Sequence, residues 1–254
     1  MGRRILELAR LDPDFEIGGA FDIPALAGTQ LLVGIGERQP TPLVVSGDPA
    51  SEIAKADVLI DFTSAQACLR NAEIAARAKK PCVIGATGLT VAHKTELITL
   101  AREVPIVYAP NMSVGVNLLF KLTYEVAKIL GIEYNVEIAE THHNLKKDSP
   151  SGTAVRLAER AAEALGLDYH ADTAHGRHGI VGERPTRQIG VHALRGGDVV
   201  GEHTVNFFGP GERIELTHRA HSRDCFAKGA LRGAKFVGSA APGLYDMQDV
   251  LGLK

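Results

Sequence analysis

The chain has 254 residues, of which 45% are hydrophobic, so it can bury a sizeable core and form one or two domains. Its formal net charge of −2 leaves no basic excess to neutralise a run of phosphates, so no nucleic-acid partner is expected. Three widely spaced cysteines without a CxxC pair, no apolar run near about 18 residues and no signal peptide predict a cytoplasmic protein without disulfides, metal site or membrane partner.

The first 110 residues alternate between helix-like and strand-like segments, a pattern typical of βαβ units around a parallel sheet. Strands are predicted at 15–22, 31–36, 42–47, 57–63, 81–88 and 105–111. Helices are predicted at 3–11, 64–80 and 91–103. Within 64–80, Cys68, Ala72, Ala75 and Ala76 fall on one helical face, which is expected to be buried.

After residue 113 the pattern changes to long helices and a second group of strands. Helices are predicted at 114–131, from about 150 to 165 and in the tail at 225–253, and strands at 133–143, 187–195, 199–208 and 212–222. Ser149 is expected to cap the middle helix, with Pro150 in its first turn. These strands predict a sheet with one face covered by helices and one face left open, which could associate with a second copy.

The stretch "HHNLKKDSPSGTA", residues 142 to 154, concentrates polar chemistry at one turn. The helix that follows starts with backbone N–H groups that suit a carboxylate or phosphate, and Lys146 and Lys147 add positive charge. Alternation along a strand aims His142 and His143 to opposite sides. A lone strand histidine is more often structural and a lysine pair is more often solvated surface, but the combination favours an anion site with a proton donor.

Further polar or glycine-bearing segments follow the predicted parallel strands, namely "DFT" at 61–63, "GATG" at 85–88 and "APNMSVGVN" at 109–117. The carboxyl ends of such strands meet at one crevice, where ligands bind. The alternative is that the glycines only make turns. Asp22 closes a predicted strand, as does the acidic residue that holds the adenosine ribose in dinucleotide-binding folds, yet no glycine loop precedes it.

The segment "ETHHNLKKDSPSGTA" resembles the E-A-H-H-x-x-K-x-D-A-P-S-G-T-A signature of the dihydrodipicolinate reductase family, also called 4-hydroxy-tetrahydrodipicolinate reductase. "DFT", "IGATG", "APNMSVGVN", "GEHTVNFFGPGERIELTHRAHSR" and "GLYDMQDVLGL" resemble the other landmarks of this family, so the resemblance covers essentially the whole chain. It departs at Ala86, where the family has Thr, and at Ser149, where it has Ala.

The resemblance implies NAD(P)H-dependent reduction of 4-hydroxy-tetrahydrodipicolinate to tetrahydrodipicolinate, in the diaminopimelate route to lysine. It implies an α/β protein with a Rossmann-like parallel-sheet cofactor domain, residues 1–112 and 224–254. An α+β substrate and oligomerisation domain with an open mixed sheet, residues 113–223, would form a homotetramer.

Carried over to this chain, the resemblance makes His142 the acid/base residue and Lys146 the proton donor. The residues implied to hold the cyclic dicarboxylate substrate are His143, Gly152 and Thr153. The residues implied to bind the cofactor are Met1, Asp22, Phe62, Gly85, Ala86, Thr87, Ala109, Pro110, Asn111 and Met112. NADH is favoured over NADPH because Ile23 follows Asp22, where members that prefer NADPH often carry Arg.

The beginning of the chain departs most from the family, which opens with a strand and G-x-x-G-R-M-G-R. Only "MGRR" is present here, so the first strand and its glycine loop are expected to be missing. Two hypotheses follow: an active reductase whose true start lies upstream, or a catalytically impaired homologue that acts as a dicarboxylate-binding or assembly protein. A third, an amino-acid or aldehyde dehydrogenase, is weaker because no cysteine has a nucleophile setting.

Overall fold

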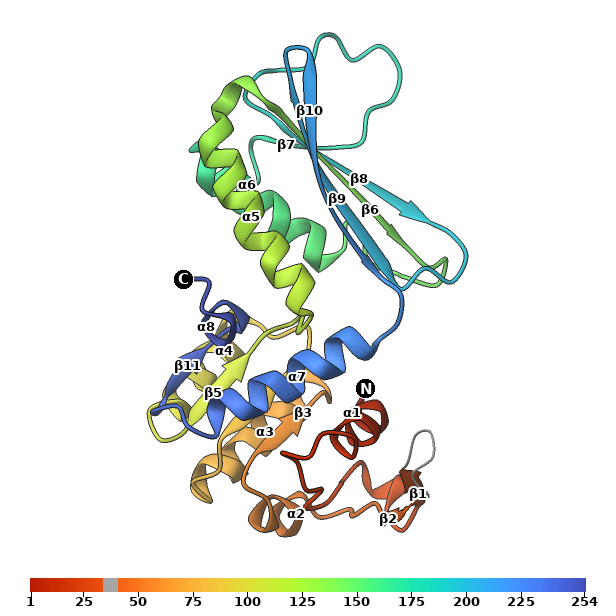
Figure 1. Ribbon diagram of the computed structural model, residues 1–254, viewed down its shortest axis with the longest axis vertical. Helices are drawn as coiled ribbons and strands as arrows, with labels where there is room; N and C mark the ends of the chain where they lie inside the picture. The colour runs from red at the N-terminus through yellow and green to blue at the C-terminus, as the bar shows by residue number, and fades with distance from the viewer. Residues whose placement is uncertain (34–40) are drawn as a thin grey trace. The chain divides into compact units, whose positions relative to one another are not determined.

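The computed structural model describes residues 1–33 and 41–254 and contains two compact units. The first comprises Met1–Val114 and Asp224–Lys254, and the second comprises Gly115–Arg223. The chain therefore leaves the first unit and returns to it at the end (Figure 1). Within these described ranges, no helix combines the length and the apolar character needed to cross a membrane.

The first unit contains a parallel sheet with helices against both faces. Its strands are β3 (Leu59–Asp61), β4 (Cys82–Ile84), β5 (Pro105–Tyr108) and β11 (Gly243–Tyr245), in the order β11-β5-β4-β3. Its helices are α1 (Gly2–Ala9), α2 (Pro49–Lys55), α3 (Ala65–Arg77), α4 (Val91–Leu100), α7 (Asp224–Val237), α8 (Met247–Leu251) and the 3-10 helix η1 (Pro24–Leu26).

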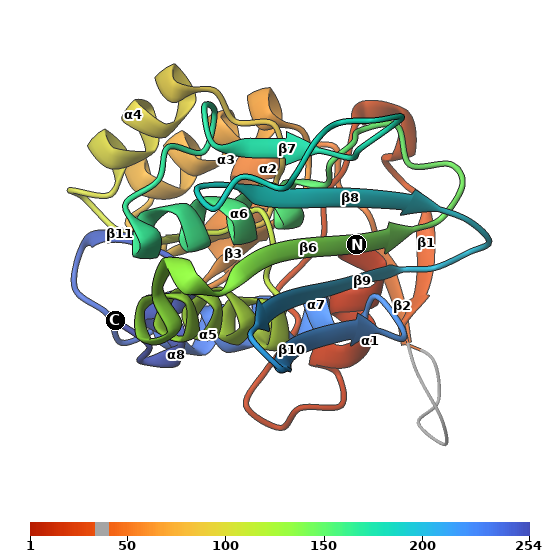
Figure 2. The ribbon, with the colours of Figure 1, turned by 90° about the horizontal axis from the view of Figure 1, so that it is seen from above.

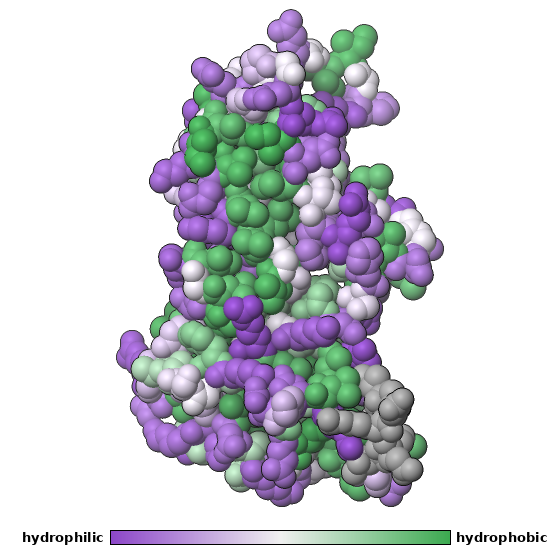
Figure 3. Space-filling view, viewed as in Figure 1, coloured by the Kyte–Doolittle hydropathy of each residue, from purple (hydrophilic) through white to green (hydrophobic). Residues whose placement is uncertain are grey.

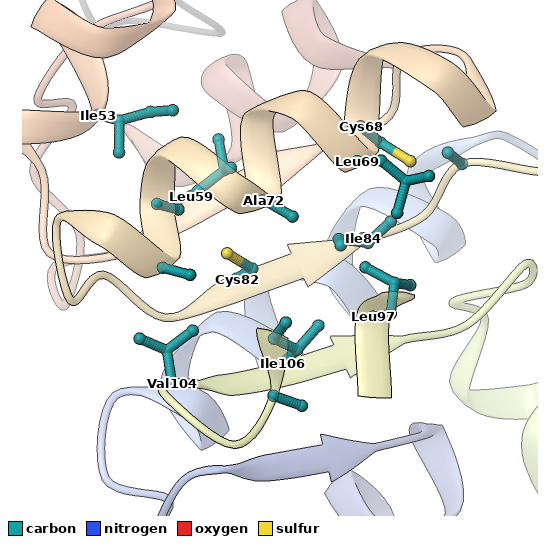
Figure 4. Close-up of a cluster of buried hydrophobic side chains, with 14 of the residues drawn as sticks. Ile53, Leu59, Cys68, Leu69, Ala72, Cys82, Ile84, Leu97, Val104 and Ile106 are labelled. Atoms are coloured by element: carbon teal, nitrogen blue, oxygen red, sulfur yellow. The ribbon is translucent and has the colours of Figure 1, made fainter. Parts of the chain in front are cut away.

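Alternation along the strands divides the apolar side chains of this sheet between two cores. Cys82 and Ile84 enter a cluster with α3 and α4, which Figure 4 shows in close-up. Val83, between them, enters a second cluster with α1 and α7. Because both faces are covered, the strands read as continuous apolar runs, as expected of a buried parallel sheet.

Two glycines of α7 differ sharply in the space around them. A Cβ at Gly229 would lie 1.7 Å from the carbonyl oxygen of Met112, whereas one at Gly233 would be 3.4 Å from the nearest atom, of Val83. Gly229→Ala is therefore expected to lower the free energy of unfolding by about 3 kcal/mol, because backbone must move. Gly233→Ala, the control, is expected to be neutral or to stabilise by up to about 1 kcal/mol. Urea unfolding would contradict the prediction if both variants had equal midpoints.

Three expectations for the first unit are wrong. Residues 15–22 form no strand, only an isolated bridge between Phe21 and Ser46, because no neighbouring strand among the described residues extends a ladder along this segment. β1 (Gln30–Val33) and β2 (Thr41–Val44) pair antiparallel in a separate two-stranded sheet instead of joining the parallel one. The tail includes strand β11 besides its helices. The end of the strand predicted at 31–36 lies outside the described residues.

The second unit is a mixed sheet with two helices on one face (Figure 2). Its elements are α5 (Val114–Leu130), η2 (Gly131–Glu133), β6 (Asn135–His142), α6 (Gly152–Leu165), β7 (Thr173–His175), β8 (Ile189–Arg195), β9 (Gly201–Gly209) and β10 (Glu212–Ala220). The strand order is β10-β9-β6-β8-β7, with β6 antiparallel to β9 and parallel to β8. The expected α/β class with an open mixed sheet is confirmed, although β7 was not predicted.

The core of this unit lies between the sheet and the helices. Leu157 and Ala158 of α6 pack with Ile138 and Phe207 of the sheet, and all four are fully buried. The other face of the sheet carries polar side chains such as Glu137, on alternate residues of β6. On α5, the outer side carries exposed apolar residues, and Figure 3 shows apolar surface there.

The start of α6 differs from the prediction. Ser151, not Ser149, is the N-cap: its Oγ accepts from Ala154 N at 3.2 Å, and the helix begins at Gly152. The shift has a physical cause, because the backbone N–H of Ser151 donates to buried Glu140 at 2.9 Å and so fixes the chain at that residue. The apolar stripe of α6 is confirmed, with Ala154 and Leu157 fully buried.

Candidate active site

A buried carboxylate organises the end of β6. Glu140 is fully buried, and its oxygens accept from both terminal nitrogens of Arg195 at 2.8 Å and from Ser151 N at 2.9 Å. His142 Nδ1 lies 2.5 Å from the same carboxylate. Burial raises the pKa of Glu140, but these hydrogen bonds outweigh burial and lower it to about 2. Glu140 is therefore ionised throughout the physiological range.

Two histidines meet beside this carboxylate. The rings of His142 and His203 contact edge to face, with centroids 5.1 Å apart. His203 is 3% exposed, its Nε2 lies 3.1 Å from Ser151 Oγ, and its Nδ1 has no hydrogen-bond partner in the described structure. Burial and then nearby His142 lower the pKa of His203 to about 3, so this imidazole is neutral.

A tight turn after β6 carries the lysine. His143 N donates to Val199 O at 2.8 Å, and Lys146 N donates to His143 O at 3.2 Å. Lys146 Nζ donates to Asp148 Oδ1 at 2.8 Å, and this hydrogen bond lowers the pKa of Asp148. Arg195 also donates to the Asp148 carbonyl at 2.8 Å, so one arginine ties the turn to Glu140.

The start of α6 completes this group. Gly152 is exposed, with open space where a Cβ would stand, and Thr153 is half-buried. Because the first N–H groups of a helix lie outside its internal ladder, this end can receive an anion. The structure thus gathers His142, His143 and Lys146 near the end of β6, and Glu140 joins this strand to Ser151, directly before Gly152 and Thr153.

The cofactor-binding residues expected from the resemblance lie in the first unit. Gly85 N donates to Asp61 O at 2.8 Å and Ala109 N donates to Ile84 O at 3.1 Å, which brings the carboxyl ends of β3, β4 and β5 side by side. A Cβ at Gly85 would lie 2.3 Å from the ring of Phe62, so only glycine leaves room for that ring.

The remaining residues of this group follow the same strand ends. Gly88 has φ +79°, with open space where a Cβ would stand. Ala86 and Met112 are buried, Thr87 and Pro110 are exposed, and Asn111 accepts from Ser113 N at 3.0 Å. Asp61, 2% exposed, accepts from Thr63 and from Asn71 and so fixes the loop after β3.

Asp22 and Met1 lie outside the four-stranded sheet. Asp22 is exposed, and its carboxylate accepts from Ile23 N at 2.8 Å. Met1 is the N-cap of α1 and makes no side-chain cap hydrogen bond. Two residues beyond that helix start, Arg4 donates to both oxygens of Asp224 at 2.6 Å, which joins α1 to α7.

Four residues of the site are absent from those expected in the sequence: Glu140, Ser151, Arg195 and His203. Glu140 could have been found, since it stands two residues before His142 on one strand and so shares its face. Arg195 lies 55 positions from Glu140 and His203 lies 52 from Ser151, and only strand pairing brings them there.

In the described part of the chain, no three His, Cys, Asp or Glu side chains gather closely enough to hold a metal ion. Its three cysteines are free, and burial raises the pKa of Cys82 to about 12 and that of Cys68 to about 11. They remain neutral thiols at physiological pH.

A second carboxylate on β6 gives a prediction about acid stability. Burial raises the pKa of Glu137, but hydrogen bonds from Arg177, Arg184 and His192 lower it to about 2, as in Glu140. Against the ordinary value of 4.5, both carboxylates stabilise the fold fully above that pH, and this stabilisation is lost as the pH falls toward 2. Glu137→Gln is expected to lower the melting temperature at neutral pH and progressively less at about pH 3. A calorimetric difference that is constant with pH would contradict this.

Comparisons with known proteins agree across both units. The family model described as "Dihydrodipicolinate reductase, N-terminus" matches residues 1–112, and the one described as "Dihydrodipicolinate reductase, C-terminus" matches residues 115–251. A 4-hydroxy-tetrahydrodipicolinate reductase of Anaeromyxobacter sp. (strain Fw109-5) is 52% identical, covering 100% of this chain and 94% of the relative. One of Geobacter sulfurreducens is 51% identical, covering 100% and 96%.

A solved structure shares the fold. Dipicolinate-bound dihydrodipicolinate reductase from Paenisporosarcina sp. TG-14 matches with a TM-score of 0.73 and 22% identity, covering 98% of this chain and 94% of that one. The fold, the family models and the curated relatives thus lead to one conclusion: the chain belongs to the dihydrodipicolinate reductase family.

Proposed function

We propose that the protein is an NAD(P)H-dependent reductase that converts 4-hydroxy-tetrahydrodipicolinate to tetrahydrodipicolinate, in the diaminopimelate route to lysine. The observation that carries the proposal is the group at the end of β6, where His142 is hydrogen-bonded to a buried carboxylate and Lys146 lies in the next turn. The relatives named as reductases, at about half identity over the whole chain, disfavour the alternative of an impaired binding protein.

The proton chemistry falls to two side chains. Reduction of an electron-poor C=C or C=N system by hydride requires a proton on the neighbouring atom, and Lys146 is the proposed donor. His142 is the proposed acid/base residue near the substrate ring, because an imidazole can both accept and donate a proton. Neutral His203, packed edge-on against His142, adds no charge to the pair.

The substrate carries two carboxylates, which need two sets of donors. His143, the N–H of Gly152 and the hydroxyl of Thr153 are proposed to hold them, because the start of α6 favours negative charge. The open space at Gly152 lets a carboxylate approach the backbone directly. The second unit is accordingly the proposed substrate domain, and its open sheet face is the proposed surface for a homotetramer.

The first unit fits a nicotinamide dinucleotide. Glycines lie at the ends of its parallel strands. At Gly85 a side chain would collide with Phe62, and at Gly88 the backbone has a positive φ, which favours glycine. Phe62, Gly85, Ala86, Thr87, Ala109, Pro110, Asn111 and Met112 are proposed to line the nicotinamide end, with Met1 at the start of α1 beside the phosphates. When bound, the cofactor supplies the hydride.

NADH is the proposed preferred cofactor. Exposed Asp22 offers a carboxylate to ribose hydroxyls, and Ile23, 60% exposed beside it, supplies no cation for a 2′-phosphate.

Steady-state kinetics of the purified chain with 4-hydroxy-tetrahydrodipicolinate test the function, with NADH and NADPH compared by kcat/KM. Oxidation of reduced nicotinamide that depends on the substrate supports the proposal. Tight binding of pyridine-2,6-dicarboxylate without any turnover would favour the binding-protein alternative instead. Mass photometry of the same sample tests the tetramer.

A further inference from the structure

The hydrogen bond between Glu140 and His142 determines which ring nitrogen carries a fixed proton. A carboxylate that is ionised can only accept hydrogen bonds, so His142 Nδ1, 2.5 Å away, must be the donor. Nε2 is then the nitrogen that gains or loses a proton. The opposite tautomer would place a lone pair against a buried negative charge.

The carboxylate itself is immobilised. Arg195 donates one hydrogen bond to each oxygen at 2.8 Å, and Ser151 N donates a third at 2.9 Å. These donors come from β8 and from the start of α6, so two elements fix the plane of the carboxylate to which His142 is hydrogen-bonded. A bidentate pair of this kind between an arginine and a carboxylate is strong, and it also fixes the geometry of both groups.

The surroundings leave Nε2 as the reactive nitrogen. A Cβ at Gly201 would lie 3.0 Å from Nε2, so a glycine at that position of β9 keeps a side chain away from it. Glu140 of β6 bonds the ring, Arg195 of β8 bonds Glu140, and neutral His203 of β9 contacts the ring edge-on. His218 of β10 and Lys146, which pairs with Asp148 in the turn, interact electrostatically with His203. Within this set the carboxylate is the group that hydrogen-bonds the ring.

We propose that Glu140 is the positioning residue of the reaction: held by Arg195 and Ser151, it keeps His142 as the Nδ1–H tautomer and leaves Nε2 to exchange the proton. The inference rests on the acid/base role proposed for His142. Glu140 acts through that ring and need not touch the substrate. The arrangement parallels the carboxylate that orients the histidine of a serine-protease triad.

The chain offers a matched control on the opposite face of the same strand. Glu137 is also held by arginines, with Arg177 and Arg184 both at 2.8 Å, and it also bonds a histidine, His192, at 2.6 Å. Its environment lowers its pKa to the same value, about 2. Glu137→Gln therefore removes an equivalent charge and ion-pair cluster without touching His142.

Kinetics of three variants separate positioning from packing. Glu140→Gln keeps the volume but offers an amide, and kcat is expected to fall about a hundredfold or more with KM changed less than about threefold. Glu140→Asp keeps an acceptor-only carboxylate and is expected to retain more of kcat than Gln does. For Glu137→Gln, measured on the fraction that elutes from a sizing column like the wild type, kcat is expected to stay within about twofold of the wild-type value. Equal losses in Glu140→Gln and Glu137→Gln, or a Gln variant as active as the Asp variant, would overturn the proposal.

Nitrogen NMR of histidine-labelled protein reports the tautomer of the ring directly and does not depend on activity. The His142 signals, identified by their loss in His142→Gln, are expected to show the Nδ1–H tautomer without substrate or cofactor, and Glu140→Gln is expected to shift the ring toward Nε2–H. An Nε2–H ring in wild type would overturn the inference even in an active enzyme. If the ring carried its proton on Nδ1 but the protein turned over no substrate, the proposed function would be wrong and the tautomer would still be as inferred.

Discussion

Replacing Lys146 by alanine is expected to lower kcat at least about tenfold, a barrier increase of about 1.4 kcal/mol or more, while cofactor affinity stays nearly unchanged. The lysine is the proposed donor of the proton that completes reduction. The same turn carries one further ammonium group, on the exposed neighbour Lys147. The cofactor residues belong to a different unit, so the affinity for NADH should not follow the loss.

The fold should survive this change. Among the described residues, Lys146 forms an ion pair with Asp148, whose side chain is 62% exposed, and such pairs contribute about 0–1 kcal/mol. Lys147→Ala is the matched control, since it removes the same charge one residue later and is expected to keep near wild-type kcat. If Lys146→Ala kept more than about a tenth of the wild-type rate, its role as proton donor would be wrong.

His142→Gln is expected to lower kcat by about a hundredfold or more, the range typical of a lost general acid or base. The glutamine amide can still donate to Glu140, so the buried carboxylate keeps its partner and the melting temperature should change little. What the variant lacks is an imidazole that can both accept and donate a proton. Stopped-flow or steady-state rates with saturating NADH and substrate measure the effect.

His192→Gln provides the comparison for this variant. His192 bonds Glu137 at 2.6 Å on the opposite face of the sheet, so its replacement alters an equivalent carboxylate–histidine pair away from the proposed site. Its kcat is expected to remain within about threefold of wild type at the same oligomeric state. Comparable losses in both variants would mean that His142 acts through structure.

Most of the fold could be predicted from local patterns. The buried strands at 59–61, 82–84 and 105–108 are short apolar runs followed by polar turns, and the stripe of α6 follows a helical period. Residues 15–22 show the limit of such patterns. Their composition suits a strand, but a strand needs a neighbour with which to form its ladder, and that depends on the rest of the sheet.

The site was predictable where its residues are adjacent in sequence. His142, His143, Lys146, Gly152 and Thr153 lie in one stretch, so their clustering and the helix start could both be expected. Arg195 lies outside the motifs, and His203 lies within the segment that begins at Gly201 without any local sign of a role. Their place in the site depends on how β8 and β9 pair with β6. The sequence favours Ser149 as the cap of α6, two residues early, for the same reason: Glu140, on a different element, fixes Ser151.

The return of the chain to its first unit has a consequence for biosynthesis. α7 supplies Ala227 and Ala230 to the second core of that unit, and β11 completes its sheet beside β5, yet both come after the whole second unit. On the ribosome, the contiguous second unit emerges before Asp224–Lys254, whereas the part of the first unit made earlier cannot complete its core and sheet until that segment has been made. A nascent chain stalled before Asp224 would expose the apolar surface that α7 later covers.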